Sequence, residues 1–296
     1  MKLTINQSNN CSFLKGFSRS LQRCFCDWQP SCRRIEVLLT ALLVASFAAT
    51  LTSCSNTEPL STVAPKPVSM GELNVSAQSV TWMSRANYLV FLPADYHETD
   101  SKRWPLILFL HGIGECGTDV WKTAVHGPLN YAKKHPDFPF ILVSPQCPVG
   151  DKWSNEAVLS VLNDVIGKYG VDTNRIYLTG LSQGGFGVWN LATTYPQRFA
   201  AVAPISGGGD VLGFIVVQWN KERTEPMRHL PFWVFHGAKD PVVPVSEDIR
   251  MVDALKKFGD TDVQLTIYPE GLHDAWTQTY NNPELYRWFL QHRLTE

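Results

Sequence analysis

Short apolar runs alternate with longer amphipathic stretches from about residue 71 to the end of the chain. Seven of the short runs have the length and the β-branched or aromatic content of strands, and most are apolar throughout. Continuous apolarity is typical of strands that are covered on both faces of a sheet. The seven predicted strands are residues 87–93, 105–112, 140–146, 175–180, 200–206, 232–237 and 264–269.

Helical patterns lie between these predicted strands. Residues 155–170 place Val158, Val161, Leu162 and Val165 on one stripe and end at a glycine. Strands that alternate with helices predict an α/β domain, with a mostly parallel central sheet and helices on both faces. The other predicted helices are residues 184–196, 246–259 and 282–293.

The first 53 residues are predicted to be an export leader. Residues 37–51 carry no charge, but this run is shorter than the about 20 residues that a membrane span needs. The segment Leu-Thr-Ser-Cys at 51–54 resembles the lipobox of bacterial lipoproteins. That resemblance implies a lipid on Cys54 and attachment to the periplasmic or cell-surface face of a bacterial membrane. A plain secretory signal and an uncleaved anchor are the alternatives.

Residues 54–70 are predicted to be a flexible tether, because they are rich in Ser, Thr and Pro and hold few large apolar groups. Residues 71–296 have the length of one domain, and the hydrophobic content of 44% suits a sizeable core. The net charge is -1 and the sequence has no basic run, so it gives no indication of nucleic-acid binding.

The cysteines divide between these predicted regions. Four of the seven lie in the leader, and Cys54 is the predicted lipidation site, which leaves Cys116 and Cys147 in the domain. Export makes a disulfide between these two permissible. Two buried free thiols are an equal alternative.

One serine lies between glycines at the end of the strand predicted for 175–180. The segment Gly180-Leu181-Ser182-Gln183-Gly184 matches the G-x-S-x-G pattern of the nucleophile elbow, with a strand before it and a helix after it. In such a tight turn flanking side chains would collide, so glycines stand on both sides and the hydroxyl is exposed. Reactive groups gather at this carboxyl edge of a parallel sheet.

A serine hydroxyl needs a base to become a nucleophile, and the base needs a carboxylate to orient it. His273 follows the last predicted strand and Asp240 the strand before it, which gives the usual order of serine, acid and histidine. Asp210 also follows a strand and is the alternative acid. His111 and His236 each end a strand before a glycine, and we expect both to be structural residues that hydrogen-bond to loop backbone.

Two backbone N–H groups are predicted to form an oxyanion hole. Gln183 begins the helix after Ser182, and Ile113 lies in a glycine-rich turn where no side chain shields its N–H from a substrate. No metal or cofactor is expected, since no cluster of His, Cys and Asp has ligand spacing. Three tryptophans are candidates for an aromatic wall that holds a sugar or phenolic ring, or else they simply pack in the fold: Trp153, Trp219 and Trp276.

Five segments resemble the esterase branch of the α/β-hydrolase superfamily, which includes phospholipase/carboxylesterase, polyhydroxybutyrate depolymerase-like and feruloyl esterase-like proteins. In chain order they are LHGIGECG (110–117), SPQCP (144–148), GLSQGG (180–185), FHGAKDPVVPV (235–245) and IYPEGLHDAW (267–276). The resemblance covers nearly all of residues 75–296 and implies the α/β-hydrolase fold. It also implies Ser182 as nucleophile, Asp240 as acid, His273 as base and the amides of Ile113 and Gln183 as the oxyanion hole. Cys116 departs from the pattern, which often has a charged residue there.

The function predicted on this basis is hydrolysis of short-chain or aryl esters, including acetyl or feruloyl esters linked to carbohydrate, through an acyl-enzyme. Residues 207–230 leave room for only a short insertion, which favours an open, shallow site. A depolymerase that acts on polyester is a further possibility. A serine peptidase of the prolyl oligopeptidase type and a non-catalytic surface-binding module are alternatives from other classes.

Overall fold

The structure is a computed structural model that describes residues 75–81, 85–99, 101–259 and 262–294. The predicted leader (1–53), the predicted lipidation site Cys54 and the rest of the predicted tether (54–70) lie outside these described residues. Within the described ranges, no helix combines the length and the apolar content that crossing a bilayer requires.

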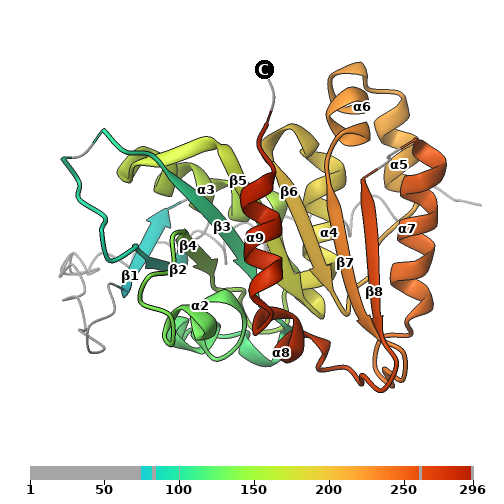
Figure 1. Ribbon diagram of the computed structural model, residues 1–296, viewed down its shortest axis with the longest axis horizontal. Coiled ribbons are helices and arrows are strands. Elements are labelled where there is room, and N and C mark those ends of the chain that lie inside the picture. The colour runs from blue at the N-terminus through green and yellow to red at the C-terminus, as the bar shows by residue number, and fades with distance from the viewer. Residues whose placement is uncertain (1–74, 82–84, 100, 260–261, 295–296) are drawn as a thin grey trace, which may run out of the picture. The chain divides into compact units, whose positions relative to one another are not determined.

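A twisted eight-stranded sheet runs through the centre of the domain (Figure 1). The strand order is β1-β2-β4-β3-β5-β6-β7-β8, in which β2 is antiparallel to both of its neighbours and β3 to β8 are parallel. The strands are β1 (Val75–Thr81), β2 (Arg85–Phe91), β3 (Trp104–Leu110), β4 (Ile141–Pro145), β5 (Val171–Leu181), β6 (Ala201–Ile205), β7 (Phe232–Gly237) and β8 (Val263–Tyr268).

The seven predicted strands correspond to β2 through β8. Every residue of β3, β4 and β6 is buried, as their continuous apolar sequences predict. The apolar pattern does not predict β1, whose sequence VSAQSVT mixes small polar and apolar residues. This strand lies at the edge of the sheet, where it needs no continuous apolar run.

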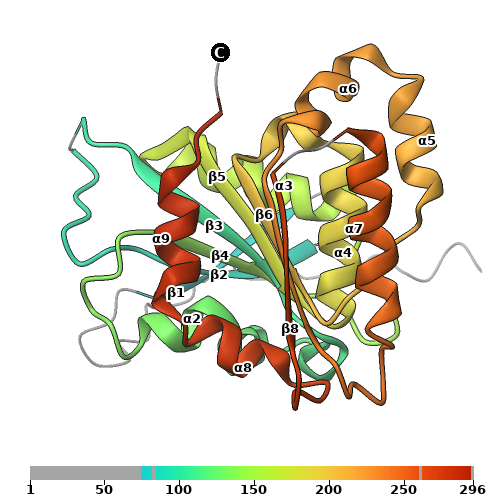
Figure 2. The ribbon, with the colours of Figure 1, turned by 45° about the vertical axis from the view of Figure 1, so that its right-hand side comes forward.

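Helices cover both faces of the sheet (Figures 1 and 2). The side chains of successive residues in β3 lie on opposite faces of the sheet. Leu106 and Leu108 belong to one core cluster, and Ile107 and Phe109 belong to the other. The first face is covered by α3 (Asn155–Lys168), α4 (Gln183–Thr194) and α7 (Ser246–Phe258), and the second by α2 (Gly127–Ala132), α8 (Ala275–Tyr280) and α9 (Pro283–Gln291). The fold predicted from the sequence, an α/β sheet covered on both faces, is confirmed.

The segment between β6 and β7 contains two short helices, α5 (Leu212–Gln218) and α6 (Lys221–Arg228), which lie on the same side as α4 and α7 (Figure 2). Met227 of α6 and Val217 of α5 are buried in the first core cluster. The insertion expected at 207–230 is therefore a small pair of helices that packs onto the domain. Three short 3-10 helices lie in connections among the described residues: η1 (Ile113–Glu115), η2 (Val120–Ala124) and η3 (Pro196–Arg198).

The carboxyl ends of the parallel strands lie at one edge of the sheet, the lower edge in Figure 1, where α8 also lies. The residues predicted for the catalytic row and the oxyanion hole follow β3, β5, β7 and β8 in the chain. Because these strands run in the same direction, their following loops meet at this edge.

Candidate active site

Ser182 occupies the sharp turn between β5 and α4. Its backbone angles are φ 52° and ψ −118°, a conformation that a residue with a side chain rarely adopts. The flanking glycines are required by space, since a Cβ on Gly180 would lie 2.7 Å from the carbonyl oxygens of Gly184 and Leu110. A Cβ on Gly184 would overlap the Leu110 carbonyl itself. The steric reason predicted for the G-x-S-x-G pattern therefore applies in this turn.

Gly184→Ala is expected to destabilise the protein by about 3 kcal/mol or more, because the new methyl group meets backbone that belongs to the central strand β3. Chemical denaturation followed by circular dichroism measures this. Gly114→Ala is the matched control, since a Cβ there has no neighbour within 4 Å, and its effect should stay within about 0.5 kcal/mol. Equal effects of the two changes would contradict the steric argument.

Three side chains that are distant in the sequence form a hydrogen-bonded row at the carboxyl ends of the parallel strands. The Nε2 atom of His273 lies 2.9 Å from the Oγ of Ser182, 91 positions away in the chain. The Nδ1 atom of His273 lies 2.7 Å from Oδ2 of Asp240. If Nδ1–H donates to this carboxylate, Nε2 is left as an acceptor for the serine proton. This is the arrangement that a nucleophile, a base and an orienting acid require.

The Asp240 carboxylate is buried and held on both oxygens. Its Oδ1 accepts hydrogen bonds from the amides of Val242 at 2.8 Å and Val243 at 2.9 Å, while Oδ2 faces His273. Burial raises the pKa of Asp240, but the hydrogen bonds from His273 and the two amides outweigh it and hold the pKa below its usual value. The alternative acid, Asp210, instead accepts from the Leu212 amide at 2.9 Å.

The two predicted oxyanion donors flank the same groove as Ser182. Ile113 begins η1 and Gln183 begins α4, and both residues line the groove beside the serine. The first N–H groups of a helix have no partner within the helix, so the Gln183 amide is available to a ligand.

The side chain of Gln183 connects the start of α4 to the turn that contains Ile113. Its Nε2 donates to the carbonyl of Asp151 at 2.7 Å, and its Oε1 accepts from the thiol of Cys116 at 3.3 Å. Cys116 follows directly on η1, so this contact fixes the Ile113 turn against the start of α4. The sequence patterns give no signal for this role, because it depends on loops that meet only in the folded chain.

Cys116 and Cys147 are both buried free thiols, which is the second of the two alternatives left open by the sequence. The Gly117 amide donates to the carbonyl of Cys147 at 2.9 Å, so the two loops are neighbours. Burial raises the pKa of both thiols, that of Cys147 to about 12.

His111 has the structural role expected from its position at the end of β3. The ring is fully buried, with Nδ1 at 2.7 Å from the Gly112 carbonyl and Nε2 accepting from the Cys147 amide at 3.0 Å. Burial lowers the pKa of His111 to about 4, so the ring stays neutral and braces the loop that contains Ile113.

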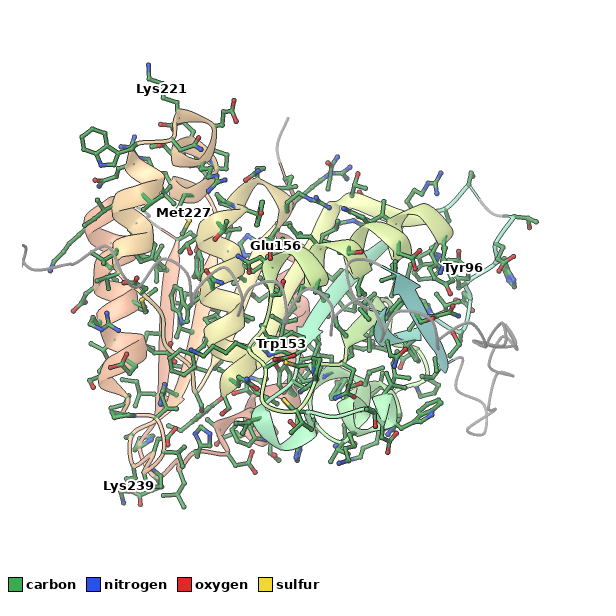
Figure 3. All side chains as sticks on the ribbon, turned by 180° about the vertical axis from the view of Figure 1, so that it is seen from behind. Tyr96, Trp153, Glu156, Lys221, Met227 and Lys239 are labelled. Carbon is green, nitrogen blue, oxygen red and sulfur yellow. The ribbon has the colours of Figure 1, made fainter. Side chains whose placement is uncertain are left out.

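A groove of about 770 Å³ extends from Ser182 along α4 toward α5 and α6. Trp153, which is labelled in Figure 3, lines this groove. Its Nε1 donates to the His111 carbonyl at 3.2 Å, and its ring packs on Gly187, where a Cβ would come within 2.9 Å of the ring. The groove mixes apolar and polar groups, among them Lys152, Phe186, Asn190, Asp210 and Arg223.

The other two candidate tryptophans lie elsewhere. Trp276 meets the ring of His273 edge-on, with ring centres 5.0 Å apart, so it packs against this histidine and is not among the residues that line the groove. Trp219 follows α5, is 86% exposed and is not among the residues that line the groove. Of the three, only Trp153 therefore lines the groove. Within the described part of the chain, no three His, Cys, Asp or Glu side chains are grouped so that they could hold a metal ion.

The strand order, the strained serine turn and the row of serine, histidine and aspartate define the class of the protein as an α/β-hydrolase. Residues 154–282 match the family model described as Phospholipase/Carboxylesterase, so this part of the chain resembles the esterase branch of the superfamily. The family resemblance predicted from the sequence is confirmed.

Comparison with known proteins gives relatives within this branch. The chain is 26% identical over 172 residues to the probable feruloyl esterase C of Aspergillus terreus, which covers 56% of this chain and 59% of the relative. It is 34% identical over 97 residues to acetylxylan esterase A of Aspergillus awamori, covering 28% of this chain and 32% of the relative. The chain spans less than two thirds of the length of either relative.

Among solved structures, a thermostable esterase aligns with 75% of this chain and 64% of its own chain. The TM-score is 0.63 and the sequence identity is 31%. The shared fold thus extends over most of the domain described here.

Proposed function

We propose that the protein is a serine hydrolase that cleaves carboxylic esters through an acyl-enzyme, with Ser182, His273 and Asp240 as its catalytic residues. The observation that carries the proposal is the continuous row of hydrogen bonds from the Ser182 hydroxyl through His273 to Asp240. The match of residues 154–282 to the Phospholipase/Carboxylesterase family model supports the same reaction class.

In the proposed first step, His273 accepts the Ser182 proton at Nε2 as the hydroxyl attacks the ester carbonyl. The N–H groups of Ile113 and Gln183 stabilise the negative oxygen of the tetrahedral intermediate. His273 then returns the proton to the alcohol oxygen, which leaves. A water molecule attacks the acyl-enzyme by the same route and releases the acid.

Asp240 acts through His273 in both steps. Its carboxylate keeps the proton on Nδ1, so that Nε2 can accept, and it stabilises the imidazolium that forms. The hydrogen bonds from Val242 and Val243 hold the carboxylate ionised while it does so.

We propose aryl and short-chain acyl esters, including feruloyl or acetyl groups on carbohydrate, as the substrates. A groove of about 770 Å³ is of the size that small ligands occupy, and it offers Trp153 and Phe186 to a ring and Asn190 to hydroxyl groups. The names of the relatives, feruloyl esterase and acetylxylan esterase, support the same substrate class.

A substrate panel tests the proposal. Purified protein is assayed with p-nitrophenyl acetate, butyrate and decanoate, methyl ferulate, acetylated xylan and a prolyl anilide. Hydrolysis of the acetate and the ferulate, with no action on the anilide, is expected. Cleavage of the anilide alone would favour the peptidase, and absence of labelling by a fluorophosphonate probe would favour the binding module.

We also propose that the protein is exported and held at a membrane by a lipid on Cys54. The support lies in the sequence, where an uncharged run is followed by the segment Leu-Thr-Ser-Cys. In a bacterial expression host, Cys54→Ser is expected to abolish incorporation of an alkyne-tagged fatty acid and to move the protein out of the membrane fraction. Cys116→Ser is the matched control, and unchanged labelling of Cys54→Ser would contradict the proposal.

A further inference from the structure

His236 is a fully buried histidine at the end of β7, four residues before Asp240. Its Nδ1 lies 2.6 Å from Oδ2 of Asp248, and its Nε2 lies 2.9 Å from the Val243 carbonyl oxygen. The same Nε2 is 3.2 Å from Oδ2 of Asp240, the oxygen that faces His273 on its other side. His236 therefore contacts a member of the catalytic row as well as the loop backbone expected from the sequence. Lys239, labelled in Figure 3, marks this loop.

Both ring nitrogens of His236 face hydrogen-bond acceptors. A carbonyl oxygen can only accept, so Nε2 carries a proton toward Val243. Nδ1 faces a carboxylate, which also accepts a hydrogen bond when ionised, so the environment fits the doubly protonated ring. Burial lowers the pKa of His236, but the hydrogen bond and charge of Asp248, with further contributions from Val243 and Asp240, outweigh it and raise the pKa above its usual value.

Asp248 joins this histidine to three other elements. It lies in the first turn of α7, where the helix favours a negative charge, and it is fully buried. Its Oδ1 accepts from Trp189 Nε1 of α4 at 2.7 Å, and its Oδ2 accepts from the Gly207 amide after β6 at 3.2 Å. The pair formed by His236 and Asp248 is thereby fixed to α4, β6, β7 and α7.

We propose that His236 is a positioning residue for the catalytic acid, which fixes Oδ2 of Asp240 against His273 through the proton donor at its Nε2 position. The inference rests on the proposed function. Asp240 then has hydrogen bonds from the amides of Val242 and Val243 on Oδ1 and from His273 on Oδ2, and its Oδ2 also lies within ion-pair distance of His236. These contacts oppose rotation of the carboxylate away from His273.

The charges along the cluster support this role. In this arrangement a doubly protonated His236 lies between the side chains of Asp248 and Asp240, and the proposed imidazolium of His273 would lie on the other side of Asp240. Without His236, two carboxylates would be buried near each other with no cation between them, which is costly in an interior of low dielectric constant.

Two amide substitutions separate the positioning role from a purely structural one. In His236→Gln the amide nitrogen reaches the place of Nε2 and keeps a donor toward Asp240 and Val243. In His236→Asn the amide nitrogen takes the place of Nδ1 and keeps only the donor toward Asp248. His292→Gln, a change of a partly buried histidine at the end of α9, is the control for loss of stability alone.

With p-nitrophenyl acetate, kcat of His236→Asn is expected to fall about 10- to 100-fold at unchanged KM, the scale of misplacing a catalytic group by about 1 Å. His236→Gln should stay within about fivefold of the unchanged protein. Equal kcat values for the two variants would overturn the inference. It would also be overturned if the fall in kcat of each variant matched its fall in melting temperature in the same proportion as in His292→Gln.

Proton NMR gives a readout that needs no turnover. The Nδ1–H of His273 in its short hydrogen bond to Asp240 should give a low-field resonance in the unchanged protein. This resonance is expected to move in His236→Asn and to stay near its place in His236→Gln. An unmoved resonance in both variants overturns the positioning role. A protein that hydrolyses no ester but shows these shifts would instead refute the proposed function, while the positioning of Asp240 by His236 would stand.

Discussion

Ser182→Ala is expected to abolish ester hydrolysis, with kcat reduced by about 10⁶-fold. The row from Asp240 through His273 ends at the Ser182 hydroxyl, and an alanine leaves no oxygen to form the acyl-enzyme. The measurement is steady-state hydrolysis of p-nitrophenyl acetate, together with labelling by a fluorophosphonate probe, which should be lost entirely.

Ser206→Ala is the matched control for this prediction. Ser206 is buried directly after the neighbouring strand β6 and also has a positive φ, 48° against 52° for Ser182. Because it has no part in the row, its replacement should leave kcat and labelling unchanged. Persistent labelling of Ser182→Ala would show that another residue is the nucleophile.

Asp240→Asn is expected to lower kcat by about 10⁴-fold without unfolding the protein. The amides of Val242 and Val243 will hold the oxygen of the new side chain, so that its NH₂ group turns toward His273. An NH₂ group requires Nδ1 to accept, which moves the ring proton to Nε2 and removes the base from Ser182. Michaelis–Menten parameters and the melting temperature are to be measured on the same preparations.

Asp210→Asn is the control for the choice of acid. Asp210 also follows a strand and lines the groove, but its carboxylate accepts from the Leu212 amide rather than from His273. A small change in kcat is expected for this variant. A severe loss in Asp210→Asn beside a mild one in Asp240→Asn would show that the acid is misassigned.

The strands were the most predictable part of the fold, because burial on both faces leaves a continuous apolar run such as Leu106 to Leu110. Short elements without such a run were not predictable. The edge strand β1 shows no strong pattern, and α8, with six residues, is too short to show a helical period. These elements depend on what they pack against.

Some features of the candidate site were likewise predictable from the local sequence, and others were not. Ser182 stands out in the sequence because its turn needs glycine on both sides, and that requirement is local. Trp153 and Trp219 looked alike in the sequence, yet one lines the groove and the other is exposed. The contacts between Gln183 and Cys116, and between His236 and Asp240, join loops from different strands and leave no mark in residue spacing.

The sequence by itself determined the alternation of strands and helices, the strained turn at Ser182 and the chain order of serine, acid and histidine, because each depends on neighbouring residues or on which residues follow strands. Tertiary structure alone decided which carboxylate faces His273, which tryptophan lines the groove and how His236 comes to lie between Asp240 and Asp248. Those outcomes depend on distances between atoms of separate loops, which are set only when the parallel strands pack and bring their carboxyl ends to one edge.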